Sequence, residues 1–209
     1  MKRRDALKLI AGAAALPAIY SHDLLALGQE VHQQLASGAA LRTLNPHQNA
    51  MVATIAEMII PATDTPGAKA ARVNEFIDLI LTDWCNEDER RRFLSGLDGV
   101  DARSRKMFGG DFVHSTARQQ VELLTAMDEE LTELRERTSE EAPAETPALS
   151  ENKSPLEQNF FHNMKRLTLF GYYTSEIGWT QGLGRPPVHM GPYQACVPLA
   201  SGTGKTNAS

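Results

Sequence analysis

Three segments of the chain begin with the same arrangement of residues, and this arrangement constrains the fold more than any other feature. An Asn or Ser is followed three positions later by Gln or Glu at 45–48, 86–89 and 154–157, and Pro stands second in the first and third segments. Such pairs cap the first turn of an α-helix, and Pro suits the first helical position. The sequence therefore predicts an all-α fold.

Apolar residues at helical spacing follow these starts and indicate a small bundle of about five main helices. Pro61 ends the first, Gly109 and Gly110 end the third, Ser115 is expected to cap the fourth, and Gly171 to end the fifth. The second carries a core-facing stripe of Val73, Phe76, Ile77, Ile80 and Trp84, and the fourth carries Val121, Leu124, Met127, Leu131 and Leu134. The expected core is Ile55, Ile59, Phe76, Ile80, Phe93, Leu97, Leu124, Phe160 and Met164.

One helical domain is expected over residues 40–200, with two irregular segments. Residues 138–153 are rich in Pro, Glu, Ser and Thr, and this composition predicts a flexible acidic insertion. After Gly171, many Gly and Pro residues exclude long regular structure, and residues 201–209 form an expected disordered tail. The aromatic residues of the irregular C-terminal segment must pack on the chain's own helices or on a partner protein. We expect them at the partner interface, with a place in the chain's own core as the open alternative; they are Tyr172, Tyr173, Trp179 and Tyr193.

Residues 1–28 have the pattern of an export signal: a basic start, a short apolar run rich in Ala and Gly, and a polar segment. The residues Arg3, Arg4, Leu7 and Lys8 resemble the twin-arginine (Tat) signal of bacteria, although Ala6 stands where that signal carries a bulky apolar residue. The alternative is an uncleaved anchor, but the apolar run is about half of the ~20 residues that span a bilayer. Cleavage is expected near Ser21 or after the 26–28 segment.

Charge and cysteine content limit the partners of the chain. The net charge is −5 at pH 7 with no basic stripe, which argues against nucleic acid as a partner. No second apolar stretch approaches spanning length, so the exported protein is expected to be soluble or peripheral to the membrane. The two cysteines, Cys85 and Cys196, have three open alternatives: a bridge to each other, a bridge to another chain, or two reduced thiols.

No pattern in the sequence predicts catalysis or metal binding by this chain. None of the histidines stands three or four positions from another His or Cys; they are His22, His32, His47, His114, His162 and His189. The 202–206 segment lacks the first Gly of a phosphate-binding loop and has no helix after it. We therefore expect no catalytic residue, metal or cofactor on this chain.

Several segments resemble the gluconate 2-dehydrogenase subunit 3 family. The resemblance covers roughly residues 40–200 and includes the Tat-like leader; its main segments are 44–48, 59–68, 76–78, 167–178 and 191–198. It implies an accessory subunit without active-site residues of its own. Its partner would be a large FAD-carrying dehydrogenase of the glucose–methanol–choline (GMC) type that acts on sugars or polyols.

The resemblance also implies how the chain works and where. The small subunit would supply the twin-arginine signal for the Tat translocase and help the large subunit to fold and cross the membrane. The complex would be periplasmic; a peripheral position at the inner membrane and a cytochrome c subunit are further candidate features of it. The alternative from another class is an independent periplasmic helical enzyme or cofactor-binding bundle, and a free-standing interaction protein is the third.

Overall fold

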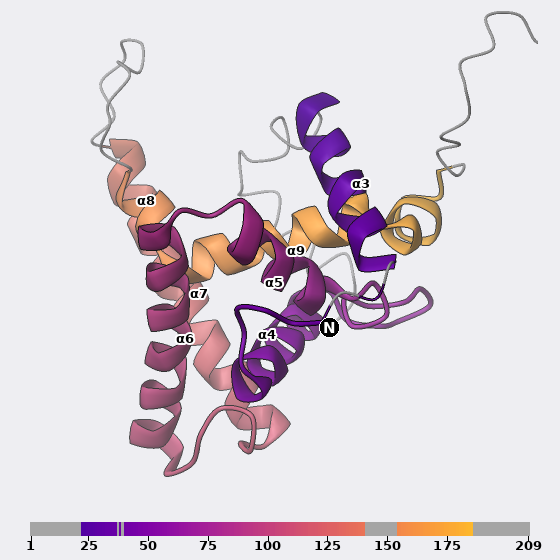
Figure 1. The fold of residues 1–209 in the computed structure, drawn as a ribbon. Helices are drawn as coiled ribbons and strands as arrows, with labels where there is room; N and C mark the ends of the chain where they lie inside the picture. Colours follow the sequence, from indigo (N-terminus) through magenta and orange to yellow (C-terminus); the bar gives the residue numbers. More distant parts are fainter. Residues whose placement is uncertain (1–21, 37, 39, 141–153, 186–209) are drawn as a thin grey trace, which may run out of the picture.

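The regular structure is entirely helical in the computed structural model, which describes residues 22–36, 38, 40–140 and 154–185 (Figure 1). The all-α prediction is confirmed. The elements are α3 (His22–Ala36), α4 (Pro46–Ile59), α5 (Val73–Asp83), α6 (Glu87–Phe108), α7 (Ala117–Glu140), α8 (Pro155–Gln158), α9 (Phe160–Thr174) and the π-helical turn η1 (Gly178–Gly182). Among the described residues, no helix is both long and apolar enough to span a membrane.

The three capping arrangements read from the sequence all form. Asn45 accepts a hydrogen bond from the Gln48 N–H at 2.9 Å, and Asn86 accepts one from the Glu89 N–H at the same distance. In all three boxes, the Gln or Glu side chain accepts in return from the N–H of the capping residue. Gly109 ends α6 in the left-handed conformation, with φ of 83°, as expected for Gly at that position.

The later helix boundaries differ from the predictions. Thr116, rather than Ser115, exchanges hydrogen bonds with Gln119 at the start of α7. The helix runs to Glu140, so the first three residues of the expected insertion are helical, while 141–153 and the 201–209 tail lie outside the described residues. The expected fifth helix is divided into α8 and α9, because Asn159 caps a new helix by accepting from the His162 N–H.

Helix α9 is the central element of the bundle. It contacts α3, α4, α5, α6, α7 and α8, and Figure 1 shows it crossing behind α5. Most of the predicted core is buried, namely Ile55, Phe76, Ile80, Phe93, Leu97, Leu124 and Met164, whereas Ile59 and Phe160 are only partly buried.

Two residues of the expected apolar stripes are exposed. Trp84 follows the last residue of α5 and is 37% exposed, because the chain has left the helical stripe at this point. Val121 is 49% exposed, while Leu123 is fully buried. Helical geometry explains the second difference, since Val121 lies roughly 100° around α7 from the centre of its buried stripe.

The sequence predicts that Gly171 ends the fifth helix, but α9 continues past it. Gly171 instead allows α9 and α5 to approach closely. A Cβ at this position would lie 2.7 Å from Cδ1 of Phe76. The Phe76 ring is fully buried, stacks on the His32 ring at 5.0 Å and meets Phe170 edge-on at 5.3 Å. Gly at 171 is therefore needed for space, and the helix continues through it to Thr174.

Helix α3 is packed onto the bundle, although its first residues fall within the expected signal peptide. Val31 and Leu35 are buried, and a Cβ on Gly28 would lie 2.5 Å from the side chain of Thr174. His32 Nε2 lies 2.9 Å from the Gly171 carbonyl, one of the last carbonyls of α9, which lack partners within the helix. The candidate cleavage segment 26–28 is therefore part of a packed helix, whereas Ser21 lies outside the described residues.

The chain entering α4 is fixed by a buried carboxylate on α5. Asp78 is 3% exposed, and its two oxygens accept hydrogen bonds from the backbone N–H groups of Arg42, Thr43 and Leu44 at 2.7–3.0 Å. A buried carboxylate is stable only when such donors surround it. This contact joins the segment before α4 to α5.

Candidate functional site

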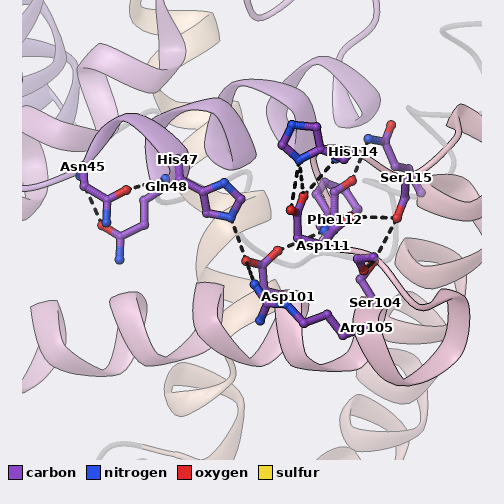
Figure 2. Close-up of polar contacts among 12 residues, drawn as sticks. Asn45, His47, Gln48, Asp101, Ser104, Arg105, Asp111, Phe112, His114 and Ser115 are labelled. Atoms are coloured by element: carbon purple, nitrogen blue, oxygen red, sulfur yellow. Dashed lines mark hydrogen bonds and ion pairs between the residues drawn. The ribbon is translucent and has the colours of Figure 1, made fainter.

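Helices α4 and α6 and the loop that follows α6 meet at a polar junction (Figure 2). His47 in the first turn of α4 lies 2.7 Å from Asp101 of α6, measured from Nε2 to Oδ2. Asp101 is 5% exposed and also accepts hydrogen bonds from the Phe112 N–H at 3.0 Å and from the Arg105 guanidinium at 3.1 Å. Both carboxylate oxygens of Asp101 are therefore engaged by protein donors.

A second carboxylate stabilises the same loop. Asp111 Oδ1 accepts from the His114 N–H at 3.0 Å and lies 2.8 Å from His114 Nδ1. These two hydrogen bonds hold the pKa of Asp111 below its usual range, and the backbone bond has the larger effect. Ser104 of α6 donates to the Gly110 carbonyl at 2.9 Å and lies 3.0 Å from the Ser115 hydroxyl, which fixes the loop on α6.

His47, Asp101 and Asp111 are the one group of described residues with ligand atoms close enough to hold a metal ion, within 4.8 Å of one another. Spacing along the chain did not reveal it, because His47 and Asp101 are 54 positions apart. His47 Nε2 already bonds to Asp101, and the other bonds to the carboxylates come from backbone and side-chain donors. These contacts explain the junction as a structural link between α4, α6 and the loop, without an ion.

A groove of about 500 Å³ lies between α5, α6, α8 and α9. We call it the aromatic groove because its lining includes Trp84, Phe93, Phe160 and Phe170. The other lining residues include Leu27, Cys85, His162 and Leu167, together with two acidic and two basic side chains, Glu89, Glu157, Arg92 and Arg166. Burial, and next the positive charges of Arg135 and Arg166, lower the pKa of His162, which favours its neutral form.

The aromatic residues expected at a partner interface occupy different environments. Tyr172 is 1% exposed and donates a hydrogen bond to the Pro66 carbonyl at 2.7 Å, so it has the core role that the sequence had left open. Tyr173 is half-buried and meets the Tyr172 ring edge-on at 5.2 Å. Trp179 in η1 is half-buried, with the Arg185 guanidinium 5.2 Å from its ring centre.

Several predicted residues lie outside the described part of the chain, namely Arg3, Arg4, Leu7, Lys8, Tyr193 and Cys196. Cys85 is half-buried in the aromatic groove. The bridge between Cys85 and Cys196 therefore stays a prediction, as does the export signal.

The chain was compared with known proteins. No curated protein and no solved structure matches it. The model of the family described as gluconate 2-dehydrogenase subunit 3 matches residues 46–191, from the first residue of α4 to beyond η1. The match covers more than half of the chain and contains both the polar junction and most of the aromatic groove. The chain belongs to the gluconate 2-dehydrogenase subunit 3 family.

Proposed function

We propose that this chain is the non-catalytic small subunit of a periplasmic, FAD-dependent GMC-type dehydrogenase of sugars or polyols. Its role is to support the folding, Tat export and stability of the large catalytic subunit, which carries the FAD. The observation that carries the proposal is the family match over residues 46–191, in a chain that begins with the Tat-like residues Arg3, Arg4, Leu7 and Lys8.

The position of α3 supports a link between the leader and the folded domain. The first residues of this helix belong to the expected leader, and its Val31 and Leu35 are buried in the same core as α5 and α9. A Tat signal serves proteins that fold before export. A signal joined to a packed helix of the fold is consistent with export of a folded subunit and of any protein bound to it.

The proposed interface for the large subunit is centred on η1. Leu183 is 42% exposed next to this turn, and Trp179 and Arg185 stack on each other beside it. Trp and Arg are over-represented among the residues that dominate binding energy at protein interfaces. Trp179 is therefore the residue we expect to contribute most to the affinity for the large subunit.

Purification of the tagged full chain from the native periplasm tests this function. We expect an equimolar large chain with the absorbance of bound flavin, and haem absorbance if a cytochrome c is also present. A chromophore bound to this chain alone, with no large chain, would instead favour the alternative function, an independent helical enzyme or cofactor-binding bundle. That alternative has one supporting observation, the size of the aromatic groove.

A variant pair tests the interface within that complex. Trp179→Ala should leave the helical circular dichroism unchanged but weaken binding of the large chain by about 30-fold, the equivalent of ~2 kcal/mol for a residue of this class. The control Val121→Ala removes an exposed apolar side chain from α7 and should leave the complex intact. Equal copurification with both variants would place the interface elsewhere.

A further inference from the structure

The aromatic groove is a surface that an apolar, uncharged segment would fit. Trp84 is 37% exposed at this groove, and Phe160, Leu167 and Phe170 are only partly buried. The charged residues of the lining cancel, with two acidic and two basic side chains. The groove therefore has no net charge that would select an acidic or a basic partner, while its rings offer apolar contact area.

The same chain contains a segment with the matching chemistry directly after the last described residue. Residues 186–200 include no Asp, Glu, Lys or Arg, and they carry four prolines together with Val188, Met190, Tyr193 and Val197. Pro-rich segments favour the extended polyproline II conformation, which docks in grooves lined by aromatic side chains at a low cost in entropy.

The length of the segment is sufficient to reach the groove. Arg185 follows η1, which packs against the C-terminal part of α9, where Gly182 lies against the Tyr172 ring. The groove follows α9 from Phe160 to Phe170, about 15 Å at 1.5 Å per residue. Fifteen residues in the polyproline II conformation span about 46 Å, which covers the approach along α9 and the groove itself.

We propose that residues 186–200 lie in the aromatic groove of their own chain, with their apolar side chains against Trp84, Phe160 and Phe170. A tethered segment has a high effective concentration at a nearby groove, which favours it over an equally suited segment of another protein. The docked segment brings Cys196 to the face of the bundle that carries Cys85. It also assigns Tyr193 to this groove instead of to the interface with the large subunit.

Photo-crosslinking within the full chain tests the proposal. A benzophenone amino acid at position 84, on the groove, should crosslink to residues 186–200 and give a product with the mass of one chain. The matched control carries the same group at position 121, exposed on α7 away from the groove, and should give no crosslink to 186–200. Because both crosslinked sites belong to one chain, the result does not depend on whether a flavoprotein binds.

Three results would overturn the proposal: a crosslink from position 84 to a large-subunit peptide, a product with the mass of two copies of this chain, or no crosslink at all.

A second measurement uses Trp179→Phe as the background, so that Trp84 is the one tryptophan left. Iodide quenching of its fluorescence should increase at least twofold with Val197→Asp added and remain unchanged with Ala208→Asp, beyond the proposed segment. Equal quenching in both variants would contradict docking.

Discussion

Replacement of Gly171 by Ala tests the packing of α9 on α5, the contact on which the centre of the fold depends. The added Cβ would lie 2.7 Å from Cδ1 and 3.0 Å from Cγ of Phe76, well inside van der Waals contact. The Phe76 ring cannot move away easily, because it is fully buried between the rings of His32 and Phe170. Overpacking of this kind costs about 1–3 kcal/mol.

Ala also has a higher helix propensity than Gly, and this gain of about 0.5–1 kcal/mol offsets part of the cost. Taking the middle of each range, we expect a net loss of about 1 kcal/mol for Gly171→Ala, which lowers the Tm of a chain of this size by roughly 2–4 °C. The matched control is Gly99→Ala, within α6, where a Cβ meets no atom within 4 Å. There the propensity gain acts alone and should raise stability by about 0.5–1 kcal/mol.

Thermal and urea unfolding of both variants, followed by helical circular dichroism, measures these changes. The two substitutions are chemically identical and both lie within helices, so opposite signs would isolate the effect of the Phe76 contact. If Gly171→Ala proves as stable as the original chain or more so, the close approach of α9 and α5 is wrong.

Two further predictions concern buried polar groups. Asp78→Ala leaves three backbone N–H groups without their acceptor and should destabilise the chain by about 2–5 kcal/mol in urea unfolding. The control Asp83→Ala breaks a surface ion pair and should change stability by less than about 1 kcal/mol. Equal effects of the two substitutions would contradict the Asp78 contact. Burial lowers the pKa of His32; its hydrogen bond to Gly171 opposes this shift, and the positive charge of Arg72 adds to it. The folded state therefore favours the neutral ring, whereas the unfolded state takes up the proton below a pH of about 6.5. Stability should therefore be fully present above that pH and fall as the pH is lowered through it, more in the original chain than in His32→Gln; identical pH profiles of the free energy of unfolding would refute this.

The sequence was informative where structure depends on neighbouring residues. Each capping box depends only on two residues that stand three positions apart in the sequence. The boxes that begin at Asn45, Asn86 and Ser154 all form. The apolar periodicity likewise identified most of the core. Such features can be predicted because their partners are fixed by helix geometry.

What the sequence did not reveal depends on contacts between distant elements. The role of Gly171 is set by Phe76, nearly a hundred residues earlier, so its interpretation as a helix end was wrong. The polar junction is a similar case, since only the fold brings His47 to Asp101. The sequence did not predict helix α3, because its start lies within a stretch that has the composition of a signal peptide, although Val31 and Leu35 are buried.

The aromatic residues after Gly171 illustrate a limit of composition as a guide to interfaces. Tyr172 and Trp179 stand seven positions apart in the same Gly-rich segment, yet the first is 1% exposed and the second is half-buried. Aromatic content predicts that such residues pack on something, but the identity of the surface depends on how the chain turns at η1.

The measurement that tests the central proposal most directly is the location of the large subunit in cells that carry Arg3→Lys and Arg4→Lys in this chain. The substitutions keep the positive charge and remove the guanidinium pair that marks a Tat signal. We predict that this chain and its flavin-containing partner are both retained in the cytoplasm, while the original chain brings both to the periplasm. Normal periplasmic flavoprotein and dehydrogenase activity with the doubly substituted chain would contradict the proposed role in export.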